Sequence, residues 1–189
     1  MSNNSDIFEE DRIYHIYSRS VGNDLLFIEE KNYLFFLDKY DQFCSRVFTT
    51  LAYCLIPNHF HFLVQVKPDI ENHQVVKAFS DFLNSYTKAF NKTYSRNGAL
   101  FQRKFKRKLV EQENYLTRMI LYIHHNPTKH RIVENFKLWN YSSYRSFLSS
   151  KPSKIDRSFV LAWFGGLESF EEIHETIKSE YLPDDFLLE

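Results

Sequence analysis

The stretch LIPNHFHFLVQV, residues 55–66, decides the fold of this chain. In an extended strand successive side chains point to opposite faces, so Phe60 and Phe62 lie on one face and His59 and His61 on the other. The first face continues with two valines and is wholly apolar, so it requires a core. The second face carries two imidazoles, about 6–7 Å apart at the backbone, close enough to converge on one divalent metal ion. The alternative is that they are two ordinary polar residues on a solvated sheet face.

Hydrophobic periodicity around this stretch predicts the element order β-α-β-β-α-β. The expected strands cover residues 12–20, 48–56, 59–66 and about 107–111, and the expected helices cover residues 29–45 and 69–93. This order is the ferredoxin-like pattern, an α+β fold in which a four-stranded antiparallel sheet carries helices on one face and leaves the other face available. We expect the two histidines to lie on that available face.

The rest of the chain is expected to be helical. An extra helix covers residues 114–125 and is ended by Asn126 and Pro127, because proline disfavours helical continuation on both of its sides. Residues 149–153, SSKPS, have the composition of a linker. We therefore expect a catalytic unit over residues 1–148 and a C-terminal helical extension over residues 149–189, with short helices over 160–164 and 170–181.

The composition excludes several classes of protein. The 189 residues contain 24 Lys plus Arg and 24 Asp plus Glu, so a globally basic nucleic-acid protein is excluded while a local basic patch is not. Only 4 Gly are present, without a GxGxxG or GxxxxGK(S/T) motif, which argues against a nucleotide cofactor. A polar start without an apolar segment, and no apolar run of membrane-spanning length, predict a cytoplasmic protein without membrane contact.

The extra helix carries a polar stripe beside its apolar one. Tyr115, Arg118, Tyr122 and Asn126 recur at i, i+3, i+7 and i+11 and share one face. Tyr122 and Asn126 are one turn apart, so they can present a phenol and an amide oxygen to the same point. The alternative is that Tyr122 is a half-buried core aromatic and Asn126 a helix stop signal. Tyr115 is a rival nucleophile, but it lacks an Asn four residues later.

A basic segment precedes the last expected strand. The residues there that can bind DNA phosphates are Arg103, Lys104, Lys106, Arg107 and Lys108, and the interleaved Phe105 can stack on an unpaired base. In strand geometry Arg103, Phe105 and Arg107 share one face, opposite the three lysines. The alternative is an edge strand that its charges protect from aggregation. Auxiliary candidates, with solvated surface as the alternative, are Arg118, Arg12, Arg19 and Lys88.

Four segments resemble one known family. Residues 57–64, PNHFHFLV, resemble the HUH motif (His, hydrophobic, His) of single-tyrosine transposases, and residues 122–127, YIHHNP, resemble the helix that carries their tyrosine. Residues 100–106, LFQRKFK, are similar to the basic segment of this family. Residues 139–144, WNYSSY, are similar to a Trp-x-x-Ser-Ser-Tyr stretch in the branch associated with repetitive extragenic palindromes (REP). The motifs occur in the family's order over roughly residues 12–144.

The resemblance implies metal-dependent cleavage and strand transfer of single-stranded or hairpin DNA through a covalent phosphotyrosine. By this resemblance Tyr122 is the nucleophile, and His59, His61 and Asn126 hold Mg²⁺ or Mn²⁺. Some relatives have Gln where this chain has Asn126, so the third ligand departs from their pattern. Relatives act as homodimers, which implies a homodimer here.

Elementary chemistry agrees with this division of roles. A phosphodiester resists attack because its oxygens are negatively charged, and a divalent cation polarises the phosphate and shields that charge. Tyrosine, with an ordinary pKa of about 10, is a weak nucleophile until positive charge nearby favours the phenolate. The metal ion itself or a neighbouring Lys or Arg can provide that charge.

Three other functions are open at this point. An HUH replication or conjugation initiator shares the His-x-His strand, but such proteins usually order their motifs differently. A catalytically silent nucleic-acid-binding module would bind a hairpin without metal and without a covalent adduct. A zinc hydrolase would need a carboxylate base beside the histidines, and the nearest candidates, Asp69 and Glu71, lie beyond the end of the strand.

Overall fold

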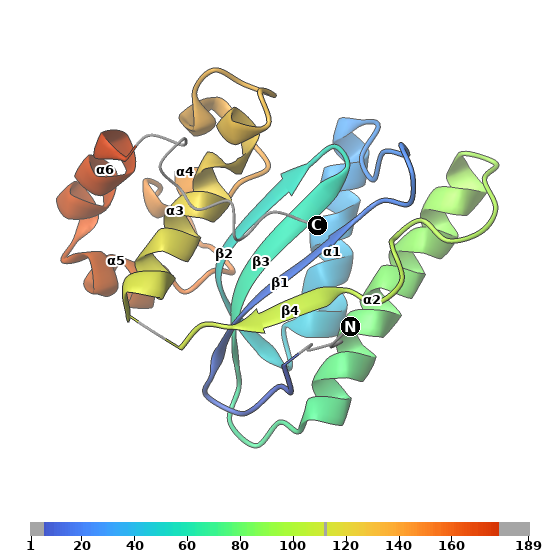
Figure 1. Cartoon of the computed structure of the whole chain (residues 1–189), viewed down its shortest axis with the longest axis horizontal. Coiled ribbons are helices and arrows are strands. Elements are labelled where there is room, and N and C mark those ends of the chain that lie inside the picture. The colour runs from blue at the N-terminus through green and yellow to red at the C-terminus, as the bar shows by residue number, and fades with distance from the viewer. Residues whose placement is uncertain (1–5, 112, 178–189) are drawn as a thin grey trace.

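A computed structural model of the chain describes residues 6–111 and 113–177 (Figure 1). The first six elements are β1 (Ile13–Arg19), α1 (Glu30–Cys44), β2 (Phe48–Ile56), β3 (His59–Val66), α2 (Asn72–Thr93) and β4 (Lys106–Leu109). The elements that follow are α3 (Glu113–Lys129), the short 3₁₀ helix η1 (Phe136–Leu138), α4 (Tyr144–Phe147), α5 (Arg157–Phe164) and α6 (Leu167–Thr176). The sheet order is β2-β3-β1-β4, and every neighbouring pair is antiparallel. The predicted ferredoxin-like fold is therefore confirmed.

The sheet lies between two helical layers. Helices α1 and α2 cover one face, and α3, followed by α4, α5 and α6, lies on the other side next to β2 and β3 (Figure 1). The extra helix thus occupies part of the face that the sequence predicted to be available. No helix in the described residues combines the length and the apolarity that crossing a membrane requires.

The first core lies between the sheet and helices α1 and α2. Phe60 and Phe62 of β3 are fully buried there, together with Phe36 of α1 and Phe79 and Phe82 of α2. The ring centroids of Phe36 and Phe82 are 4.7 Å apart, and those of Phe36 and Phe60 are 5.2 Å apart. The apolar face of residues 59–66 therefore packs as predicted, and its burial orients the histidine face toward α3.

A second core joins α3 to β2 and to the C-terminal extension. Ile120 and Ile123 of α3 are fully buried in it, and so are Val160 of α5 and Phe170 of α6. The described part of the extension is thus packed against the helix that carries Tyr122. The boundary between residues 148 and 149 remains a prediction.

Residues 139–156, which include the start of the extension, cover the outer edge of β2. The backbone N–H of Ser143 donates to the Tyr53 carbonyl (2.9 Å), and that of Asp156 donates to the Thr50 carbonyl (2.8 Å). The Trp139 indole N–H donates to the carbonyl of Leu55 (2.8 Å). An exposed edge strand is a template for unwanted pairing, so residues 139–156 protect this side of the sheet.

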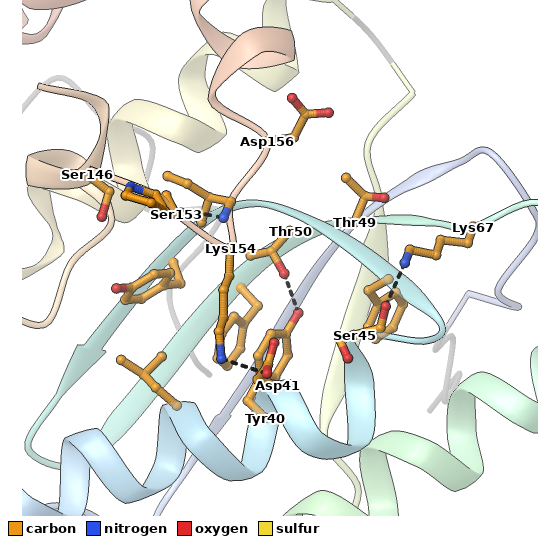
Figure 2. Close-up of a pocket in the computed structure, with 16 residues that line it drawn as sticks. Tyr40, Asp41, Ser45, Thr49, Thr50, Lys67, Ser146, Ser153, Lys154 and Asp156 are labelled. Atoms are coloured by element: carbon orange, nitrogen blue, oxygen red, sulfur yellow. Dashed lines mark hydrogen bonds and ion pairs between the residues drawn. The ribbon is translucent and has the colours of Figure 1, made fainter. Parts of the chain in front are cut away.

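Residues 152–156 also form one wall of a cavity of about 640 Å³, which lies between them, α1 and β2 (Figure 2). Its wall includes Tyr40, whose hydroxyl lies 2.8 Å from the Thr50 hydroxyl. Lys154 reaches across from the extension to Asp41, with 2.6 Å between Nζ and Oδ2. The cavity lies at the β2 edge on the side of α1, and the two histidines lie on the other face of the sheet.

Two predicted boundaries were wrong. Helix α3 does not end at Asn126 but continues through Pro127 to Lys129. A proline within the last turn removes only one backbone donor, and the N–H groups of His130 and Ile132 bond to the carbonyls of Asn126 (3.0 Å) and Pro127 (2.9 Å) to close the end. Strand β4 covers Lys106–Leu109 and so ends before the predicted residue 111, and Arg103 and Lys104 precede it in a bend, Lys104 with a φ of 59°. The predicted helix over residues 170–181 is α6, and residues 178–181 lie outside the described residues.

A chain of buried hydrogen bonds ties α6 to α3 and α3 to β2. His174 Nδ1 lies 2.7 Å from the Phe170 carbonyl, His174 Nε2 lies 2.8 Å from His124 Nδ1, and His124 Nε2 lies 2.8 Å from the Ser143 hydroxyl. Neutral tautomers satisfy every member of this chain when each ring donates once and accepts once. Burial, the main cause, lowers the pKa of His174 to about 3 and that of His124 well below its ordinary value.

This chain predicts acid sensitivity of the fold. The unfolded histidines bind a proton below a pH of about 6.5, whereas the folded ones stay neutral, so the unfolded state binds more protons and stability falls with falling pH. We expect the free energy of unfolding to decrease between pH 7 and pH 5, and His174→Gln to flatten this dependence by up to about 1.4 kcal/mol per pH unit. Urea unfolding across this range measures it. His73→Gln, at a side chain 72% exposed, is the control; an equal flattening in both variants would contradict the assignment.

Candidate active site

Four residues predicted from the sequence meet between β3 and α3. His59 and His61 project from β3 on the side of α3, with 3% and 0% of their surface exposed. Tyr122 and Asn126, one turn apart on α3, are 1% and 0% exposed. The apolar stripe of α3 packs on β2, and this packing turns the Tyr122–Asn126 side of the helix toward the histidines.

The Asn126 amide lies between the two imidazoles. Its Oδ1 is 3.0 Å from His59 Nε2, and its Nδ2 is 3.3 Å from His61 Nε2. The two rings stand nearly perpendicular, with centroids 5.1 Å apart. Both Nε2 atoms thus converge on one amide, which makes this trio the candidate ligand set.

The Nδ1 atom of each histidine, the ring nitrogen that does not face Asn126, has a hydrogen-bond partner of its own. His59 Nδ1 is 2.8 Å from Asn58 Oδ1, and His61 Nδ1 is 2.8 Å from His15 Nε2. A partner on the distal nitrogen sets the tautomer and the ring orientation of a metal-ligating histidine. Asn58 and His15 therefore aim the two Nε2 lone pairs at the same place.

The surroundings of His59 fit a cation in the trio when Nδ1 carries the ring proton. Burial, the main cause, lowers the pKa of His59 to about 3, so the ring is neutral near pH 7 and carries one N–H. Yet its two nitrogens face two amide oxygens, Asn58 Oδ1 and Asn126 Oδ1. When Nδ1 donates to Asn58, the Nε2 lone pair meets the lone pairs of Asn126 Oδ1, and a cation between them relieves this repulsion.

The donor set restricts the kind of cation. Among the described residues no group of three or more His, Cys, Asp or Glu is arranged to hold a metal ion; the candidate set is two imidazoles and one amide oxygen. Such a set suits Mg²⁺ or Mn²⁺ when water and phosphate oxygens complete the shell.

Tyr122 lies beside this trio. Its ring stands edge-on to His61, with centroids 5.3 Å apart and planes at 86°. Lys129 Nζ, two turns further along α3, is 5.3 Å from the Tyr122 ring centroid. The Lys129 ammonium thus makes a cation–π contact with the Tyr122 ring. The rival Tyr115 lies two turns before Tyr122, with Lys108 Nζ 5.2 Å from its ring centroid.

Sequence reasoning did not assign roles to three neighbours of the histidines. His15 and Tyr17 of β1 lie on the histidine face, because Tyr17 pairs with His61 and His15 with Leu63. His130, just after α3, has its ring 4.6 Å from that of His59. Alternation in residues 13–19 places His15 and Tyr17 on one strand face. Only the pairing of β1 with β3 shows that this is the histidine face.

In the basic segment, side chains alternate between the two faces of the sheet only from Phe105 onward. Lys106 and Lys108 pair with Tyr17 and His15 and lie on the histidine face. Phe105 is 9% exposed and packs on Phe79, with centroids 4.6 Å apart, so the expectation that Phe105 stacks on a DNA base is wrong.

The remaining predicted DNA contacts lie elsewhere. Arg107 points to the other face of the sheet, where its guanidinium lies 4.6 Å from the Phe8 ring centroid and donates to the Asp6 carbonyl. Arg103, Lys104 and Arg118 are exposed. Lys106 and Lys108 are therefore the predicted contacts that lie on the face of the site.

Comparison with known proteins places the chain in a family. The model of the IS200-like transposases matches residues 31–126, half of the chain, and this range contains His59, His61, Tyr122 and Asn126. The chain belongs to the IS200-like transposase family. A Haemophilus influenzae protein named as a REP-associated tyrosine transposase is 33% identical over 117 residues, which span 58% of this chain and 66% of the relative, just under two thirds of its length.

A solved structure shows the same fold. A REP-associated tyrosine transposase bound to a REP hairpin superposes with a TM-score of 0.62 at 16% identity, covering 80% of this chain and 89% of that one. At this identity the likeness concerns the fold alone.

The trio predicts metal binding that depends on the Asn126 amide. Asn126→Ala removes the one oxygen of the set, and we expect the affinity for Mn²⁺ to fall about tenfold or more. Electron paramagnetic resonance of free Mn²⁺ during a titration measures it without DNA. Asn84→Ala, at an exposed asparagine of α2, is the matched control. Unchanged affinity in Asn126→Ala would remove Asn126 from the ligand set.

Proposed function

We propose that this protein cleaves and rejoins single-stranded DNA at hairpins through a covalent bond to Tyr122. The carrying observation is the position of Tyr122, whose ring lies 5.3 Å from that of His61 in the same chain. His59, His61 and Asn126 would hold Mg²⁺ or Mn²⁺. The bound ion would polarise the scissile phosphate and shield its negative charge.

The residues of the chain account for the attack. The Tyr122 oxygen forms a bond to phosphorus while the bond from phosphorus to O3′ breaks; the phenol loses its proton and O3′ gains one. Lys129 favours the phenolate by its charge, and burial keeps water from competing. The phosphotyrosine preserves the energy of the phosphodiester, so a DNA 3′-OH can attack it and restore a DNA strand.

Surface charge and the similar solved protein support the proposed substrate class. Lys106 and Lys108 lie on the histidine face beside β1, and Arg103 and Lys104 precede them at the surface. Basic side chains of this kind follow a DNA backbone. The similar solved protein is bound to a REP hairpin, and we propose hairpin DNA as the substrate here. We also propose that the protein is a homodimer. Residues 1–148 would form its catalytic unit and residues 149–189 its extension.

A denaturing-gel assay tests the chemistry. Tyr122→Phe removes only the hydroxyl, so we expect it to abolish a metal-dependent, denaturant-stable adduct with labelled hairpin oligonucleotides. Tyr115→Phe, two turns away on the same helix, is the matched control and is expected to retain the adduct.

Other outcomes identify other functions. Loss of the adduct only in Tyr115→Phe would keep the chemistry and move the nucleophile. Tight binding of several hairpins without any adduct in the wild-type protein would indicate a silent binding module.

A further inference from the structure

Arg19 ends β1 on the face of the candidate site. It pairs with His59 in the β1–β3 register, so the two side chains project from the same face of adjacent strands, about 5 Å apart at Cβ. Its Nε is buried, and no hydrogen-bond acceptor for it occurs in the described residues. The guanidinium is thus held next to His59 with an unused donor.

An unused buried donor of this kind requires an explanation. Buried polar groups in folded proteins are nearly always hydrogen-bonded, and Arg keeps its charge at any ordinary pH. Within residues 6–111 and 113–177, no carboxylate forms an ion pair with Arg19. The neighbours that feel its charge are His59 and His130. Carboxylates and phosphates are the partners that a planar guanidinium binds best, so a phosphate oxygen is a partner that suits Arg19.

Arg19 and Tyr122 approach the trio at different positions along β1. The Tyr122 ring contacts the rings of His61 and His15, at centroid distances of 5.3 and 6.3 Å. Arg19 lies four residues along β1 from His15, about 13 Å at the backbone. His61 pairs with Tyr17 and His59 pairs with Arg19, so the trio reaches the level of Arg19 itself. Tyr122 therefore lies at the His61 end of the trio, and Arg19 lies beside its His59 end.

In phosphoryl transfer the attacking and the leaving oxygen lie roughly in line through phosphorus. With Tyr122 attacking from one end of the trio, the O3′ leaving group departs toward the other end. We propose that Arg19 binds the phosphate immediately 5′ of the scissile one and so holds the strand that ends in the leaving 3′-OH. This assignment rests on the proposed function. It gives the DNA one polarity in the site and keeps the 3′-OH in place for rejoining.

The protein segment beside Arg19 offers a path for the DNA strand that carries the leaving 3′-OH. The N–H of Gln102 donates to the Arg19 carbonyl (2.9 Å), and Ser20 pairs with Phe101. These bonds place the segment with the exposed Arg103 and Lys104 directly beside Arg19. A DNA strand that passes Arg19 would thus continue over the basic residues Arg103 and Lys104.

Neutral phosphate analogues test the assignment. In the Tyr122→Phe background, which binds without cleaving, single methylphosphonates are placed along a hairpin oligonucleotide that forms the adduct with wild-type protein. We expect neutralisation of the phosphate 5′ of the scissile position to weaken binding about tenfold, as loss of a charged hydrogen bond does. Fluorescence anisotropy measures it. Greatest sensitivity on the tyrosine side of the scissile phosphate would overturn the assigned polarity.

A double-mutant cycle then assigns the contact to Arg19. Arg19→Gln should weaken binding of the natural oligonucleotide about tenfold, and the methylphosphonate should then add less than about twofold, because both changes remove one interaction. Arg19→Lys keeps the charge and is expected to restore part of the affinity. Arg46→Gln, at an exposed arginine between α1 and β2, is the control for charge alone.

The outcomes separate this inference from the proposed function. Adduct formation by wild-type protein, together with additive losses in the cycle, would keep the transposase chemistry and remove Arg19 from the phosphate. Absence of the adduct would reject the chemistry on which the assignment rests. The methylphosphonate series needs no substitution at Arg19, so it decides the polarity even if Arg19→Gln fails to fold.

Discussion

The packing of α3 on the sheet is the constraint on which the site depends. Ile120 and Ile123 are fully buried between α3 and β2, and their burial sets the rotation of the helix. Once that rotation is set, helical spacing turns Tyr122 and Asn126 together toward β3. Continuation of the helix through Pro127 keeps Asn126 inside regular backbone, where its amide meets both Nε2 atoms.

The C-terminal extension supports this packing from the other side. The hydrogen bonds from His174 through His124 to Ser143 join α6, α3 and the edge of β2. His124 is adjacent in sequence to Ile123 and two residues from Asn126, so the bonds that hold it also hold the position of α3. The WNYSSY segment therefore has a structural reason: it covers the sheet edge and anchors the helix that carries Tyr122.

Periodicity within single helices and strands predicted much of this arrangement. It could not predict how the strands pair with one another. Alternation separated the buried Phe60 and Phe62 from His59 and His61, and helical spacing associated Tyr122 with Asn126. The places of His15 and Arg19 depend on the register of β1 against β3, a non-local property that no periodicity contains. Phe105 was misassigned because alternation shows that a side chain changes face but not which face is buried.

The site separates two electrostatic roles that a single residue cannot combine. Burial holds His59 and His61 neutral, their pKa values far below the ordinary one, so their lone pairs remain available to a cation. Cationic side chains on the same face, such as Lys106, Lys108 and Arg19, are suited to bind phosphates instead. Lys129 contacts the Tyr122 ring, Arg19 lies beside His59, and the charges of both act on His130. The two ends of the trio differ because Tyr122 lies at the His61 end and Arg19 at the His59 end, and a DNA strand bound at both ends would have one direction.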